Sequence, residues 1–183
     1  MLSPDVREKA GKAIRRGILT AIAIPFVVGA ALLVFRWCGY AIVVNPSPSI
    51  AVGFYLVKYN DRTPVRNGYV AFDVDSQEGQ YGYRLGWIRP GAPYLKRVYG
   101  LAGDRVCVTD SMVSVNGIRL GAVKQADRQG RALPHAIQGC IVVPDGRFFP
   151  LGDGAESSYD GRYFGTVSVN MIRGRVAPLW VFK

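Results

Sequence analysis

Residues 94–104 read YLKRVYGLAGD and give the clearest indication of the fold. Its side chains alternate so that Tyr94, Lys96 and Val98 share one face, which is the pattern of a β-strand. The Gly-Asp pair at 103–104 is typical of a turn that ends such a strand. A lysine among apolar strand residues loses hydration, which disfavours the ammonium form and lowers the pKa. The stretch therefore predicts a strand that carries a candidate general base, Lys96.

A base of this kind needs a nucleophile beside it, and a serine-rich segment, NPSPSI at residues 45–50, directly follows a long apolar segment. Ser49 is the candidate nucleophile, because a Ser/Lys pair is a known variant of the serine–histidine arrangement. The two residues are far apart in the sequence, so their pairing is a prediction about tertiary structure. The alternatives are a solvated linker serine and an exposed strand lysine.

The N-terminal part predicts one membrane-spanning helix. Residues 17–35 carry no charge, and the apolar stretch resumes after Arg36 up to residue 44, which is enough to cross a hydrocarbon core of about 30 Å. We expect residues 1–16 to be a basic cytoplasmic flank, 17–44 the transmembrane helix and 45–183 an exported domain. The flank's basic residues are Arg7, Lys9, Lys12, Arg15 and Arg16. The alternatives are a cleavable signal peptide, whose apolar region is usually shorter, at about 7 to 15 residues, and a buried core helix.

The formal net charge of +10 does not indicate nucleic acid as a partner. Part of the excess lies in the basic flank, and the other arginines are scattered along the sequence instead of forming one run. Membrane lipids with anionic head groups are the partner that this charge favours. We expect no metal or other cofactor, because the lone His135 has no second histidine or acid at ligand spacing.

After residue 44 the pattern changes to short β-like segments separated by turn residues, which predicts a mostly β domain. Asn116-Gly117 is typical of a type I′ hairpin turn. The polar, glycine-rich residues 75–91 indicate a surface loop, with or without a short helix. Cys107 and Cys140 each stand beside a β-branched run in the exported part, so a disulfide between them is expected, with two buried thiols as the alternative.

Three strings of residues occur here in the order found in type I signal peptidases, which the chain resembles over nearly all of the sequence after residue 44. They are PSPSI at 46–50, YLKRVYGLAGD at 94–104, and Gly152-Asp153 followed by Ser158, Asp160, Arg162, Tyr163 and Gly165. The resemblance implies a signal peptidase-like β-fold in which Ser49 is the nucleophile and Lys96 the base.

The same resemblance assigns supporting roles. The Ser47 hydroxyl would join the Ser49 backbone N–H in the oxyanion hole, and Ser158 would orient the lysine ammonium. Tyr94 would line the pocket. Asp160 and Arg162 would form a structural ion pair under the site, and a direct role for an aspartate would make Asp160 or Asp153 the first candidate.

The sequence differs from those of housekeeping signal peptidases in ways that indicate a particular subfamily. Pro48 and Ile50 stand where those enzymes usually have glycine and methionine, and the chain has no room for their large second β domain. In these respects the chain resembles the TraF-type peptidases of conjugative transfer systems, which serve pilus assembly and in some members cyclise the pilin.

The resemblance implies a serine endopeptidase of the bacterial inner membrane with a periplasmic catalytic domain, whose partners are a pilin or another leader-bearing precursor and conjugative pilus assembly proteins. The alternatives are a transpeptidase acting on a pilin, a general type I signal peptidase, and a non-catalytic assembly factor with the same fold.

Overall fold

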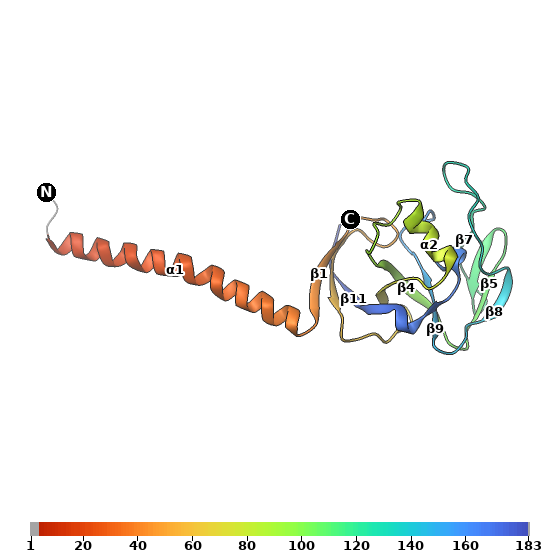
Figure 1. The fold of residues 1–183 in the computed structure, drawn as a ribbon, viewed down its shortest axis with the longest axis horizontal. Helices are drawn as coiled ribbons and strands as arrows, with labels where there is room; N and C mark the ends of the chain where they lie inside the picture. Colours follow the sequence, from red (N-terminus) through yellow and green to blue (C-terminus); the bar gives the residue numbers. More distant parts are fainter. Residues whose placement is uncertain (1–3, 183) are drawn as a thin grey trace. The chain divides into compact units, whose positions relative to one another are not determined.

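A computed structural model describes residues 4–182 and divides them into an N-terminal helical unit, which ends at Tyr40, and a mostly β unit, which begins at Ala41 (Figure 1). The helices are α1 (Pro4–Trp37), α2 (Gln77–Arg84), α3 (Gly161–Phe164) and the 3-10 turn η1 (Val169–Met171). The strands are β1 (Tyr40–Asn45), β2 (Gly53–Lys58), β3 (Tyr69–Phe72), β4 (Tyr94–Leu101), β5 (Arg105–Val108), β6 (Met112–Val115), β7 (Ile118–Ala122), β8 (Gly139–Val142), β9 (Arg147–Leu151), β10 (Val167–Ser168) and β11 (Ile172–Val181).

Helix α1 contains one span, Arg15–Trp37, that is long and apolar enough to cross a membrane, a test that a signal sequence would also pass. The prediction of a helix over 17–44 is wrong at its C-terminal end, because α1 ends at Trp37 and β1 begins at Tyr40. Gly39 separates them with a positive φ of 83°, a conformation that suits glycine. The residues that follow include the β-branched run 42–44, which favours a strand over a helix. The side chains of Arg7 and Lys9 lie outside the described part of the chain.

The strands form two sheets. The seven-stranded sheet has the order β1-β2-β11-β3-β4-β9-β10, and the four-stranded sheet the order β7-β6-β5-β8. Strand β4 lies inside the larger sheet, antiparallel to both β3 and β9, with Lys96 opposite Val70. Buried and half-buried positions alternate along β4, which confirms the strand and the shared face of Tyr94, Lys96 and Val98. A stiff, doubly paired strand therefore carries the candidate base.

Two apolar clusters pack the β unit. The larger one contains Phe72, Tyr94, Val98, Phe148 and Phe149, together with residues of the smaller sheet and of α3. A smaller cluster joins Ile50 to Tyr55, Val57, Ala71 and Val176. Because Ile50 is fully buried in this cluster, the residue that follows the candidate nucleophile Ser49 anchors the segment 45–50 to the sheet.

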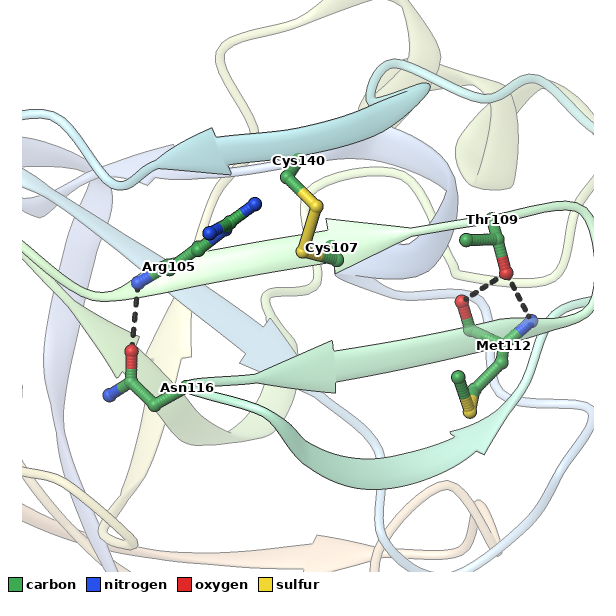
Figure 2. The surroundings of a disulfide bond; sticks show 6 residues. All are labelled: Arg105, Cys107, Thr109, Met112, Asn116 and Cys140. Atoms are coloured by element: carbon green, nitrogen blue, oxygen red, sulfur yellow. Dashed lines mark hydrogen bonds between the residues drawn. A yellow bond between two sulfur atoms is a disulfide. The ribbon is translucent and has the colours of Figure 1, made fainter.

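The expected type I′ turn is present between β6 and β7, where Asn116 and Gly117 both have positive φ angles, of 51° and 81°. Figure 2 shows the neighbouring disulfide, in which Cys107 of β5 is bonded to Cys140 of β8. These cysteines are directly opposite in the antiparallel register, with their Cα atoms 4.0 Å apart. The bond fastens the end of the long segment 123–138 to the smaller sheet. Residues 75–91, expected as a loop with or without a helix, contain α2, whose first turn is capped by Ser76.

Candidate active site

Ser49 lies in the short segment that connects β1 to β2 and is partly exposed. The Ser47 hydroxyl is close to both functional groups of this residue: it accepts a hydrogen bond from the Ser49 backbone N–H at 3.3 Å and lies 3.2 Å from the Ser49 Oγ. The Ser47 hydroxyl and the Ser49 backbone N–H are the two donors that the sequence resemblance assigns to an oxyanion hole. The two groups are hydrogen-bonded to each other in this structure, so a peptide carbonyl oxygen that binds both of them has to replace that contact.

Asn45, at the end of β1, holds this segment in place. Its Nδ2 donates hydrogen bonds to the carbonyl oxygens of Ser47 (2.8 Å), Ala51 (3.1 Å) and Ile50 (3.4 Å), while its Oδ1 accepts from the Ser47 N–H at 3.3 Å. The side chain is buried. One amide thus fixes the backbone on both sides of Ser49.

Lys96 is buried, with 4% of its surface exposed, and its Nζ donates a 2.9 Å hydrogen bond to Ser158 Oγ. Burial lowers the pKa of Lys96 to about 8, an effect that the negative charge of Asp160 opposes and the positive charge of Arg162 reinforces. A large share of the amine is therefore neutral near pH 8 and able to accept a proton. This is the environment that the alternating pattern around Lys96 predicted.

The segment 152–158 brings Ser158 to Lys96 and also contacts the segment that carries Ser49. The Gly154 N–H donates to the Ser49 carbonyl oxygen at 3.1 Å. A Cβ at Gly154 would overlap the Pro48 carbonyl, and one at Gly152 would overlap the Ser158 hydroxyl. Glycine is required at both positions because the two segments touch backbone to backbone.

Asp160 and Arg162 form an almost fully buried ion pair beneath this segment, with N–O distances of 2.9 Å through both Nε and Nη2 of the arginine. Asp160 also accepts from the Gly152 N–H at 2.9 Å, and Arg162 donates to the Ser158 carbonyl at 3.1 Å. The pair therefore braces both ends of the segment that carries Ser158. It acts on Lys96 through its charges and through this segment, not by direct hydrogen bonds among the described residues.

Asp153 faces a different group of residues. Its Oδ2 accepts from Arg97 Nη1 at 3.0 Å and from the Tyr69 hydroxyl at 3.1 Å. Burial and the Asp153 carboxylate raise the pKa of Tyr69 to about 12. Asp153 is thus held by Arg97, which is the neighbour of Lys96 in β4 but projects from the other face of the strand.

Several of the candidate site residues line one cavity of about 580 Å³. Ser47, Ser49, Lys96, Ser158 and Tyr94 all line it. Much of the remaining lining is apolar or small and comes from residues 43–48, 87–95 and 155–159. Tyr94 donates its hydroxyl to the Gly79 carbonyl at 2.8 Å, so its ring is fixed in the wall. The cavity can take an extended peptide with small side chains.

Asn45 is not among the site residues that the sequence predicts. An asparagine before proline at the end of a β-branched strand is a recognisable turn signal, but its four contacts depend on how the segment folds back. No group of three or more His, Cys, Asp or Glu side chains suited to a metal ion occurs among the described residues.

A comparison with known protein families assigns the chain to a class of proteins. The profile of the family described as signal peptidase, peptidase S26 matches residues 14–181. The chain therefore belongs to the S26 signal peptidase family, whose members are serine peptidases.

Particular relatives narrow the comparison. A plasmid transfer protein TraF of Escherichia coli is 35% identical over 146 residues, which is 74% of this chain and 81% of the relative. Another Escherichia coli plasmid transfer protein TraF is 33% identical over 177 residues, which is 88% of this chain and 97% of the relative. A crystal structure of a signal peptidase I from Enterococcus faecalis is 26% identical, with a TM-score of 0.39, and the match covers 63% of this chain and 97% of that chain.

Proposed function

We propose that this chain is a membrane-anchored serine endopeptidase that removes the leader peptide of a conjugative pilin precursor, with Ser49 as nucleophile and Lys96 as general base. The observation that carries the proposal is the burial of Lys96, with its lowered pKa, in the wall of the same cavity as Ser49. The pilin as substrate rests on the likeness to proteins described as plasmid transfer proteins TraF.

The first half of the reaction forms an acyl-enzyme. Neutral Lys96 accepts the proton of the Ser49 hydroxyl, and the Ser49 oxygen attacks the scissile carbonyl carbon. The negative charge on the carbonyl oxygen is stabilised by the Ser49 N–H and the Ser47 hydroxyl. The Lys96 ammonium then gives its proton to the departing amine as the peptide bond breaks.

In the second half neutral Lys96 takes a proton from water as the water oxygen attacks the acyl carbon. The Lys96 ammonium then returns this proton to the Ser49 oxygen as the ester bond breaks. In the described residues the Lys96 amine is hydrogen-bonded to Ser158 and the Ser49 hydroxyl is close to Ser47. A bound peptide must therefore bring the two catalytic groups together, as is common when a free enzyme binds substrate. A pilin amino group in place of water would give a cyclic product instead of a linear one.

The topology that fits this role is a helix α1 in the inner membrane with the β unit in the periplasm. The uncharged segment after a basic flank supports this orientation. The oxidising periplasm is also a compartment in which the disulfide between Cys107 and Cys140 would form.

The test is to coexpress the chain with the pilin precursor encoded beside it and to measure the intact mass of the pilin. Wild type should give the cleaved mass, and Ser49→Ala and Lys96→Ala should leave the precursor unprocessed. The matched controls, Ser111→Ala and Lys58→Ala, change exposed residues outside the cavity and should process normally.

The mass of the product distinguishes the remaining possibilities. A linear cleaved pilin means a leader peptidase, and a mass lower by one water means head-to-tail cyclisation. Processing that survives both Ser49→Ala and Lys96→Ala would refute the catalytic assignment and leave a non-catalytic assembly factor as the better description.

A further inference from the structure

A second cavity, of about 340 Å³, adjoins the candidate active site and shares Trp87, Ser157 and Tyr159 with it. Its other wall is the segment 123–138, which leaves the smaller sheet after β7 and returns at β8 (Figure 1). The two cavities therefore adjoin along these three shared residues. The shared residues Trp87 and Tyr159 mark the place where a peptide bound in the first cavity would have to pass to reach the second.

The second cavity is positively charged. Three cationic side chains line it, from Lys124, Arg128 and Arg131, against a single carboxylate, Asp127. That carboxylate is already used within its own turn: it accepts from the backbone N–H groups of Gln129 (2.8 Å) and Arg131 (2.9 Å) and from Arg131 Nε (2.6 Å). The cavity thus carries an excess of positive charge beyond its internal pairing.

The cations have capacity left for a ligand. Lys124 is 3.8 Å from Glu156, whose side chain is 79% exposed, so this pair is weak. Arg128 forms no ion pair with any described residue. Arg131 uses only its Nε for Asp127, and its guanidinium lies over the Trp87 ring, 5.6 Å from the ring centre. Stacking and the ion pair hold that guanidinium ready to bind a carboxylate.

Three aromatic rings, those of Trp87, Tyr159 and Tyr163, also line this cavity. Tyr159 is stacked on Tyr163 with ring centres 5.3 Å apart, and it forms a T-shaped pair with Trp87 at the same distance between ring centres. A lining that combines aromatic rings with cationic side chains suits a peptide segment that combines a carboxylate with apolar atoms. A lipid head group would use the cations alone.

We propose that this second cavity binds an acidic segment of the precursor while its leader lies in the active site, through Arg128, Arg131 and Lys124. The proposal rests on the proposed peptidase function and adds a selectivity to it. Precursors with Asp or Glu close to the cleavage site are then preferred over neutral ones.

The test uses three internally quenched peptides that share one small-residue cleavage sequence. One carries three Glu on the N-terminal side, one carries three Glu on the C-terminal side, and one has Gln at all of these positions. The full chain in detergent should cleave one Glu peptide with about tenfold higher kcat/KM than the Gln peptide at low salt. The ratio should fall towards one in Arg128→Glu and in high salt, whereas Arg62→Glu, which changes an exposed arginine outside both cavities, should keep it.

Binding to Ser49→Ala, measured by fluorescence polarisation, separates this proposal from the peptidase function. Tighter binding of a Glu peptide that is lost in Ser49→Ala/Arg128→Glu supports the second cavity even if wild type cleaves no peptide. Equal binding and equal cleavage of the three peptides would overturn it. So would an Arg128→Glu effect confined to activity in vesicles with anionic phosphatidylglycerol, because that result would assign the cations to lipid head groups.

Discussion

Lys96 Nζ donates a 2.9 Å hydrogen bond to Ser158 Oγ, and each of the two residues is only 4% exposed. The lysine comes from the doubly paired strand β4, and the serine from a segment braced at both ends by the ion pair of Asp160 and Arg162. A flexible amine is thereby held at one point of the cavity.

Ser158→Ala should lower kcat by about 10²-fold with little change in KM, because the amine loses the acceptor that orients it while the peptide-binding walls stay in place. The measurement is steady-state cleavage of a leader peptide. Ser157→Ala is the neighbouring control, although it also lines the cavity, so its effect should fall on KM. An equal loss in both variants would count against an orienting role for Ser158.

The pH dependence of cleavage should reflect the neutral form of Lys96. Burial lowers the pKa of this residue to about 8, so kcat/KM of the wild type should rise with pH up to about 8 and level off above it. Asp160 raises the pKa of Lys96 by its charge, so Asp160→Asn should move the midpoint to lower pH. A midpoint near the ordinary lysine value of 10.5 would contradict the assignment.

Lys96→Met should abolish cleavage and stabilise the fold. The pKa of Lys96 is lower in the folded state than the ordinary 10.5, so the buried ammonium costs free energy below about pH 8, and this cost fades between about pH 8 and 10.5. At pH 7 the substitution should raise the free energy of unfolding by on the order of 2 to 3 kcal/mol. Urea titrations at pH 7 and pH 10 test this, with the more exposed Lys58→Met as control; a gain that does not shrink at pH 10 would point to packing instead.

Asn45→Ala should reduce kcat by about 10- to 100-fold and the free energy of unfolding by about 1 to 3 kcal/mol, because the carbonyls around Ser49 lose their shared donor. Asn45→Asp should be at least as harmful, since it turns a carboxylate oxygen towards those carbonyls. Kinetics and unfolding of both variants can be compared with the exposed Asn170→Ala. Wild-type kinetics in Asn45→Ala would mean that Ser49 is positioned by other contacts.

The double variant Cys107→Ala/Cys140→Ala should lose about 2 to 4 kcal/mol of stability, the amount typical of a bond that closes a loop of about 30 residues. Chemical unfolding with and without a reducing agent measures this, and Cys38→Ala serves as control. If the reducing agent lowers the stability of the double variant as much as that of wild type, the effect of the reducing agent does not come from the bond between Cys107 and Cys140.

The sequence alone determined the local features of this protein. The alternation in residues 94–104 specified the strand and the buried face of Lys96, because side-chain direction in a strand repeats every two residues. Asn116-Gly117 specified its hairpin turn through backbone preferences. The apolar run before residue 38 specified a helix of membrane-crossing length. The apolar residues 42–44, which are β-branched, belong to strand β1 and not to this helix.

The tertiary structure decided which of these local features meet. The lowered pKa of Lys96 depends on burial by residues distant in the sequence, and the hold of Asn45 on Ser49 depends on how one segment folds back. The second cavity exists because Trp87, the segment 123–138 and Tyr159 converge, and no local pattern in the sequence records that. Contacts between distant segments are fixed by packing and by charge pairing in three dimensions, so only the folded chain shows them.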